Sequence, residues 1–359
     1  MKIPLSSTDT RSILANPQHF ADKFKKAQES LGHRTGPNVL WLRETQDDSK
    51  FVLPDENFAN GFPTISRCLT DFESGIACIV GQANHGKSSL MVSMMTAGLD
   101  LNSDLIVVDV SLDDPPKKRY TQYLANLTGL HYSQLNVPTT LNPNQLGAIK
   151  SADQKIHDWI MGGRLIPLEA SEKITEETLN QIRKITVRSY KTLLNLMRDV
   201  RATYPDKKIA FFVDAWNNLD SSNTNDADNL SSINKMLDTI QEVADQERIM
   251  CIVSAHVRKT QSRKISLEDI KGTKNMEYSC VWGAIVKNEY RDNSLTDPLL
   301  WEDSNGKSYP IVTVETGKTK VSSEDRTCFY VLKAGQCQVQ GVTNLEYELL
   351  LSQCQGNRT

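Results

Sequence analysis

Two glycines with four residues between them, followed at once by a lysine and a serine, are the residues of this chain best placed to do chemistry. They are Gly81, Gly86, Lys87 and Ser88, and they fit the P-loop (Walker A) pattern at every fixed position. Such a loop turns several backbone N–H groups toward one phosphate group. Lys87 can then contact the outer phosphates as a point charge, and the Ser88 hydroxyl can bind Mg²⁺. The spacing predicts a site for ATP or another nucleoside triphosphate.

The segments on either side of the loop support this prediction. An apolar run at 76–80 predicts a buried strand, and the residues from about 87 to 98 predict a helix. A glycine-rich turn that matches by chance is the alternative, but the strand and the helix stand where a phosphate loop needs them. We expect the whole loop to contact phosphate: Gly81, Gln82, Ala83, Asn84, His85, Gly86, Lys87, Ser88 and Ser89.

Polar side chains follow three more predicted strands. The apolar runs at 105–110 and 209–213 have the continuous hydrophobicity of strands buried on both faces, and Asp113 and Asp214 stand after them. Ligands bind at the carboxyl ends of strands in such sheets, so both carboxylates should face the site. Asp214 is the expected Mg²⁺ ligand, usually through a water, with a structural capping role as the alternative. The strand at 249–253 leads to His256, which can sense a γ-phosphate but alone would suggest only a structural histidine.

Composition excludes several classes of protein. The 359 residues are 39% hydrophobic and 24% charged, as in ordinary globular proteins, and the net charge is −3. A polyanion would therefore have to bind at a local patch. The apolar runs are shorter than the roughly 18 residues of a membrane span, and the N-terminus lacks the apolar core of a signal peptide. Seven scattered cysteines with no C-x-x-C pair indicate buried free thiols in a reducing compartment and argue against zinc.

The remaining patterns give the expected organisation. We predict an N-terminal helical arm and linker at 1–60, an α/β core at 61–342 and a C-terminal tail at 343–359. The arm has an apolar helical stripe over 9–31, which packs either on its own domain or on a neighbouring subunit, and a short strand at 39–42. In the core, residues 115–200 look mostly helical. Helices are expected at 172–201 and 232–245, strands at 281–286 and 311–314, and a closing hairpin at 327–342.

A basic run follows the strand that ends at His256. Arg258, Lys259, Arg263 and Lys264 lie within seven residues, and Lys274 comes shortly after. A solvated surface is the ordinary interpretation of such a run. Because this one leaves the predicted nucleotide site directly, a loop that contacts a polyanion is the alternative.

In order and spacing, residues 61–342 resemble the helicase domain of the DnaB-like replicative helicases and the related phage T7-type helicases, within the RecA-like ATPases. GQANHGKSS matches the first motif, VDVSLDD the strand that ends in the catalytic glutamate, FFVDAW the second nucleotide motif and VSAHVRK the third. ISLEDIKGTKNMEYS is similar to the DNA-contacting loop. ETGKTK resembles the Lys-x-Arg pair that a neighbouring subunit inserts against the γ-phosphate. The resemblance implies these catalytic residues: Lys87, Asp113, Asp214, His256, Lys318 and Lys320.

Three departures from the family pattern bear on turnover. Asp113 is one methylene shorter than glutamate, and Lys320 stands where an arginine finger is expected. A lysine cannot make the planar two-pronged contact of arginine. Lys274 replaces the third residue of a Gly-Ser-Gly pattern. The first two changes suggest slower or differently coupled hydrolysis.

The resemblance implies a RecA-like core with a twisted, mainly parallel sheet and helices on both faces. It implies a homo-oligomeric ring, expected to be a hexamer, that hydrolyses ATP with Mg²⁺, moves 5′ to 3′ on single-stranded DNA and unwinds duplex DNA. The cytoplasm of a bacterial or phage-infected cell is the expected location, with primase or another replication protein as a further partner and no membrane contact. One alternative is a RecA-type ATPase that acts as a nucleotide-switched assembly, loading or regulatory factor. A weaker one is a small-molecule kinase.

Overall fold

The structure is a computed structural model that describes the central part of the chain. The described residues are 18, 22, 74–137, 140–169, 173–178, 181–186, 188–219, 229–257, 267, 270, 279–292, 300–303, 305–319, 327–342, 346–350 and 352. The predicted helix over 9–31 and strand at 39–42 lie outside this set, apart from Gln18 and Asp22. The proposed boundaries at 60 and 342 stay predictions.

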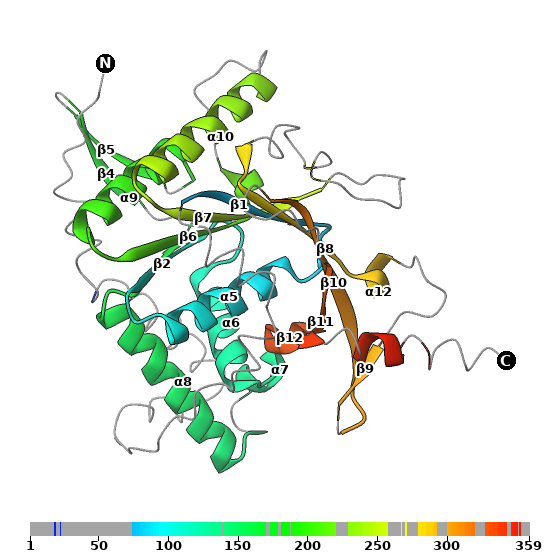
Figure 1. The fold of residues 1–359 in the computed structure, drawn as a ribbon. Coiled ribbons are helices and arrows are strands. Elements are labelled where there is room, and N and C mark those ends of the chain that lie inside the picture. Colours follow the sequence, from blue (N-terminus) through cyan, green and yellow to red (C-terminus); the bar gives the residue numbers. More distant parts are fainter. Residues whose placement is uncertain are drawn as a thin grey trace.

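A single ten-stranded sheet forms the centre of the described part (Figure 1). Its strand order is β12-β11-β10-β8-β1-β7-β6-β2-β3, with β9 beside β10. The six strands from β8 to β3 run parallel, and β10, β11 and β12 continue the sheet antiparallel. The strands are β1 (Gly75–Gly81), β2 (Leu105–Ser111), β3 (Leu165–Glu169), β6 (Lys208–Asp214), β7 (Met250–His256), β8 (Trp282–Lys287), β9 (Leu300–Glu302), β10 (Ser308–Thr319), β11 (Thr327–Lys333) and β12 (Gln338–Val342).

Helices cover both faces of this sheet (Figure 1). One face carries α5 (Lys87–Leu101), α6 (Pro116–Thr128), the short α7 (Tyr132–Leu135) and α8 (Pro143–Met161). The other face carries α9 (Tyr190–Thr203) and α10 (Asn229–Gln246). Every residue of β1 and β2 is buried, as two covering layers require. The predicted mainly parallel sheet with helices on both faces is confirmed.

Most of the strands predicted inside the core are present. The runs at 76–80, 105–110, 209–213 and 311–314 lie within β1, β2, β6 and β10, and those at 249–253 and 281–286 begin one residue before β7 and β8. The closing hairpin at 327–342 is the antiparallel pair β11 and β12. These runs were predictable because strands buried on both faces need continuous hydrophobicity. None of the described cysteines forms a disulfide, and four of them are buried: Cys78, Cys251, Cys280 and Cys337.

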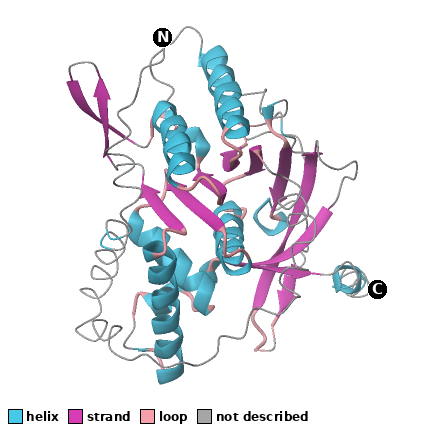
Figure 2. Cartoon of the chain, turned by 60° about the vertical axis from the view of Figure 1, so that its left-hand side comes forward, coloured by secondary structure: helices cyan, strands magenta, loops and turns pink. Residues whose placement is uncertain are grey.

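The long helix predicted over 172–201 is wrong. Residues 173–178 and 181–186 form β4 (Lys173–Thr178) and β5 (Gln181–Thr186), an antiparallel pair outside the main sheet, and α9 begins only at Tyr190 (Figure 2). Isoleucine and threonine recur in KITEET and QIRKIT, and β-branched residues favour strands over helices. The apolar residues at helical spacing gave the opposite prediction.

The prediction of a mostly helical 115–200 also missed β3 at the edge of the sheet. Its short run contains Pro167, which lies opposite Asp109 of β2. A proline cannot donate a ladder hydrogen bond, so it is accommodated at an edge where one side needs none. Among the described helices, none is both long and apolar enough to cross a membrane.

Candidate nucleotide-binding site

The phosphate loop joins β1 to α5 through two glycines that a side chain would disturb. Gly86 has φ of 97°, and a Cβ placed there would lie 2.9 Å from side-chain carbons of Leu332. A Cβ on Gly81 would lie 2.5 Å from the carbonyl oxygen of Val286. Glycine alone allows both this backbone conformation and this approach. The loop is therefore packed against β8 and β11 as well as shaped for a phosphate.

Lys87 points back over the loop from the first turn of α5. Its Nζ donates to the carbonyl oxygens of Gly81 and Gln82, each at 2.8 Å, and lies 3.3 Å from Nδ1 of His256. Burial lowers the pKa of Lys87 to about 8, and the charge of Asp214 offsets part of that effect. A phosphate oxygen at the loop would offer the ammonium a charged acceptor in place of two neutral ones.

This lowered pKa predicts that nucleotide affinity falls above about pH 8. The protonated amine is the form that attracts phosphate, so affinity should be constant below that pH. Above it, the free protein must take up a proton to bind, which weakens binding up to about tenfold per pH unit. Binding of fluorescent ADP measured between about pH 7 and pH 9.5 tests this. A Lys87→Arg variant should bind with little pH dependence because guanidinium stays charged. An equal slope in that variant would assign the titration to another group.

Asp214 ends β6 and forms the centre of the predicted magnesium site. Its Oδ1 accepts a 2.7 Å hydrogen bond from Ser254, and its Oδ2 accepts a 3.0 Å bond from Nη2 of Arg119. Burial alone would raise the pKa of Asp214, but the Arg119 charge and hydrogen bonds from Ser254 and Ser88 hold it below its usual value.

This arrangement fits Mg²⁺. The Ser88 hydroxyl donates a hydrogen bond to Asp214, which leaves the lone pairs of the hydroxyl oxygen for a metal. The two side chains supply hard oxygen donors, and Mg²⁺ needs few protein ligands because it keeps several waters.

The four strand ends meet at one edge of the sheet. Gly81 lies opposite His256, and Ser111 lies opposite Asp214. The backbone N–H of His256 donates to Oδ1 of Asn217 at 2.8 Å, which fixes the end of β7. The structure therefore brings Lys87, Ser88, Asp214 and His256 together, as their sequence positions predicted.

Asp113 and its neighbour Asp114 have different environments beyond the end of β2. The Asp114 carboxylate is buried and accepts hydrogen bonds from Lys118 at 2.5 Å and Gln122 at 2.6 Å, both on α6. Asp113 is exposed. Of the two acids, Asp113 is thus the one that could meet a water in the crevice.

Of the remaining predicted residues, the structure describes only Lys318, and its backbone does not lie at the loop of its own chain. Lys318 lies opposite Gly283 of β8, and Gly283 lies opposite Cys78, three residues before Gly81 on β1. Three residues of strand span about 10 Å, so the Lys318 backbone is displaced toward the other end of the sheet. Six predicted residues lie outside the described part of the chain: Arg258, Lys259, Arg263, Lys264, Lys274 and Lys320.

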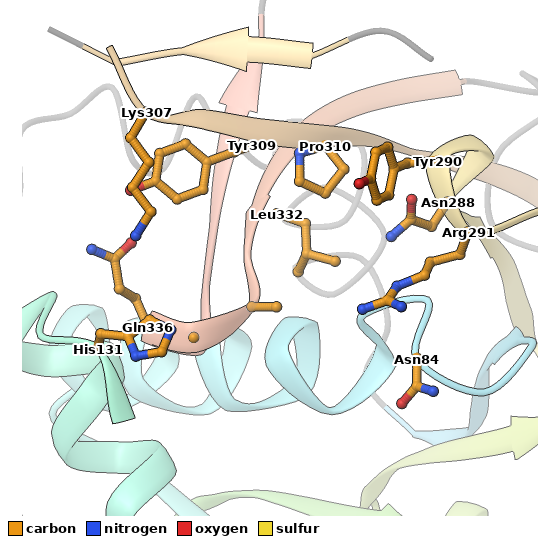
Figure 3. Close-up of a pocket in the computed structure, with 12 residues that line it drawn as sticks. Asn84, His131, Asn288, Tyr290, Arg291, Lys307, Tyr309, Pro310, Leu332 and Gln336 are labelled. Carbon is orange, nitrogen blue, oxygen red and sulfur yellow. The ribbon is translucent and has the colours of Figure 1, made fainter. Parts of the chain in front are cut away.

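A cavity of about 220 Å³ opens beyond the tip of the phosphate loop (Figure 3). Asn84 of the loop lines one end, with Tyr290 and Arg291 of α12 (Glu289–Asp292) and Tyr309 of β10 around it. Flat aromatic and guanidinium groups suit a planar ring. Sequence reasoning did not identify this cavity, because its walls come from segments that are far apart in the sequence.

Sequence reasoning also missed a buried arginine next to Asp214. Arg119 of α6 is 1% exposed and lies between Asp109 and Asp214. The available signal was Asp109 itself. An aspartate inside a continuous apolar strand is buried and therefore requires a charged or hydrogen-bonding partner.

Comparisons with known proteins give structural matches only. No family model matches the chain, and no curated protein matches it. Its structure is similar to a solved ATPase domain, with a TM-score of 0.62 and 13% identity over 82% of this chain and 93% of that one. It is also similar to a DnaB-like replicative helicase whose interactions with primase are described, with a TM-score of 0.62 and 13% identity over 83% of this chain.

The match to that helicase covers 65% of its length, so the chain spans less than two thirds of it. At 13% identity, the likeness lies in the arrangement of strands and helices rather than in the sequence. The sequence motifs that suggested the resemblance lie at strand ends and loops, so they are consistent with a likeness in the arrangement of strands and helices. The chain has the RecA-like fold of the ATPase domains of DnaB-like helicases.

Proposed function

We propose that this chain is a Mg²⁺-dependent nucleoside triphosphatase that forms a ring, translocates on single-stranded DNA and unwinds duplex DNA. The observation that carries the proposal is the cluster of Lys87, Ser88, Asp214 and His256 at one sheet edge, with Lys87 Nζ 3.3 Å from the histidine. The shared fold supports it. ATP is the proposed nucleotide, and movement from 5′ to 3′ is proposed from the resemblance.

Each residue of the cluster has a role that its surroundings support. Lys87 neutralises the outer phosphates, and Ser88 and Asp214 hold Mg²⁺, which supplies further charge neutralisation when bound. Asp113 is exposed beyond β2 and takes the role of orienting and deprotonating the attacking water. An aspartate is shorter than a glutamate, so the water must lie closer to the strand.

His256 is the proposed link between nucleotide state and DNA. Its Nδ1 lies against Lys87 while the lysine is held by loop carbonyls. A phosphate that draws Lys87 forward would change this contact at the end of β7. The basic residues Arg258, Lys259, Arg263, Lys264 and Lys274 follow within 18 positions and are proposed to contact the phosphates of single-stranded DNA.

The cavity beyond Asn84 is the proposed place of the nucleobase. It adjoins the tip of the loop through Asn84, within the part of the site that binds the phosphates in this proposal. Tyr290 offers an exposed ring and Arg291 offers a planar cation, whereas the ring of Tyr309 is buried and already has the Lys307 ammonium 5.1 Å from its centroid (Figure 3). Stacking on such groups tolerates any base, so we do not assign nucleotide preference to it.

The ring is proposed because one pair of catalytic residues requires a second subunit. Lys318 is displaced along β10 from its own loop, which suits a residue that acts on a neighbour's nucleotide. Lys320 is proposed to act with it. A hexamer and a primase partner are proposed from the resemblance, and the second structural neighbour is itself a helicase described with primase.

A second function has one observation in its favour. Asp113 and Lys320 are both poorer catalysts than the glutamate and arginine of the resembled family. A nucleotide-switched ATPase that assembles, loads or regulates without unwinding would tolerate slow turnover.

The experiment that separates the two is stimulation by single-stranded DNA. A helicase should hydrolyse ATP several-fold faster with DNA, and Arg263→Glu with Lys264→Glu should abolish the stimulation but keep ADP binding. Lys207→Glu with Lys208→Glu is the matched control, because it reverses two exposed charges at the opposite end of β6. Rates that DNA leaves unchanged, together with nucleotide-dependent rings in electron micrographs, would favour the switch.

A further inference from the structure

Arg119 makes a buried bridge between two carboxylates. From α6, its Nε lies 3.0 Å from Oδ2 of Asp109 and its Nη2 lies 3.0 Å from Oδ2 of Asp214. Nη1 donates to Oε1 of Gln122 at 2.9 Å, and Tyr123 donates to Oδ2 of Asp109 at 2.9 Å. The guanidinium is thus hydrogen-bonded to Gln122 and Asp214, and its Nε makes a close ion pair with Asp109 without a hydrogen bond.

Stability alone is a weak reason for such a bridge. Burying three charged groups carries a desolvation cost that their attraction often does no more than balance. Asp109 lies within β2, two residues before the strand ends at Ser111, and its Oδ1 has no hydrogen-bond partner among the described residues. The Asp109 carboxylate is linked to the site through Arg119, which contacts both Asp109 and Asp214.

We propose that Arg119 is a positioning residue for Asp214. Arg119 fixes one carboxylate oxygen and Ser254 fixes the other, so the carboxylate cannot rotate. The Ser88 hydroxyl then meets an acceptor of fixed orientation, and both oxygen donors stay aimed at the same Mg²⁺. Asp109 and Tyr123 support the arginine. The inference rests on the proposed function, since it concerns the same metal.

The position of α6 gives this bridge a second consequence. The helix begins three residues after Asp113, and Asp114 is bonded to Lys118 and Gln122 of its first turns. Gln122 also accepts from Arg119. One helix therefore holds the proposed metal ligand through Arg119 and fixes Asp114, the residue next to the proposed water-activating Asp113.

The test uses variants that keep the local charge constant. Asp109, Arg119 and Asp214 together carry −1 (−1 + 1 − 1), and removing Arg119 alone would leave −2, which by itself attracts Mg²⁺. Arg119→Lys keeps the charge but loses the planar fork. Asp109→Asn with Arg119→Met also leaves −1, on Asp214. The measurement is binding of a fluorescent ADP analogue to the full chain, first in EDTA and then as Mg²⁺ is added.

We expect both variants to bind ADP in EDTA as the unmodified protein does, because Lys87 and the loop are intact. The Mg²⁺ concentration that gives half of the change in ADP binding, here called the Mg²⁺ midpoint, should rise about 10-fold or more for the double variant. This is the usual effect of losing a residue that orients a metal ligand. Arg119→Lys should give a smaller rise. If the double variant does not fold, the Mg²⁺ dependence of ADP binding by Arg119→Lys tests the proposal alone.

Arg164→Met is the matched control. Arg164 is a half-buried arginine at the opposite end of the sheet, where it donates to the carbonyl oxygens of Leu99 and Asn102. Its loss should lower thermal stability and leave the Mg²⁺ midpoint unchanged. If the Arg119 variants also lose stability with an unchanged midpoint, the bridge is only structural and the inference is overturned. If the unmodified protein shows no effect of Mg²⁺ on ADP binding, the proposed function fails first, and the positioning role with it.

Discussion

Replacing Lys87 with alanine should reduce ATP hydrolysis about 100- to 1,000-fold, the usual effect of losing one preorganised group that stabilises charge in the transition state. Lys87 is 6% exposed and its ammonium lies within the phosphate loop, 2.8 Å from two loop carbonyl oxygens. In the variant, a cation from the solvent would have to replace the ammonium, and its local concentration would be far below that of a group attached to the loop. ADP binding should weaken as well, since the same ammonium contacts the β-phosphate.

The measurement is steady-state release of phosphate, with thermal unfolding as a check on the fold. Lys155→Ala is the matched control, because Lys155 is another largely buried lysine and is paired at 2.7 Å with Asp100, near the C-terminal end of α5. That variant should keep the full rate. Undiminished hydrolysis by Lys87→Ala would mean that this loop is not the catalytic centre.

The sheet and the strand ends were predictable because burial on both faces leaves a strong mark in a sequence. The runs at 105–110 and 209–213 contain almost no polar residues, and a polar residue at the end of such a run must lie at the edge. The order of strands and loops therefore predicted that Lys87, Asp214 and His256 would lie close together. The motif residues could therefore be placed without knowing how the helices pack.

Other features depend on pairings that no local pattern encodes. Arg119 and Asp214 are 95 positions apart, and α6 carries several charged residues of which one happens to be buried. Nothing in the helix distinguishes Arg119 from Lys118, whose side chain is 59% exposed. The prediction for β4 and β5 failed for a different reason. The apolar residues of this segment fit a helical spacing, whereas its β-branched residues favour strands.

Mixing two inactive variants should restore hydrolysis if the lysine pair acts across a subunit boundary. Lys320→Ala subunits keep the phosphate loop, and Lys87→Ala subunits keep the lysine pair. In a closed ring each site uses the loop of one subunit and the lysines of the next. Random mixing at equal amounts then leaves about one site in four with both parts intact, so about a quarter of the unmodified rate should return.

The backbone register gives the physical reason to expect this result. Lys318 lies opposite Gly283, toward the end of β8 that faces away from the loop, so its backbone is displaced by roughly 10 Å along the strand from the loop. The control is a mixture of Lys87→Ala with a Lys87→Ala, Lys320→Ala double variant, which contains no intact loop and must stay inactive. If the first mixture also stays inactive at every ratio, Lys320 does not serve a neighbour's nucleotide, and the proposed ring loses its catalytic role.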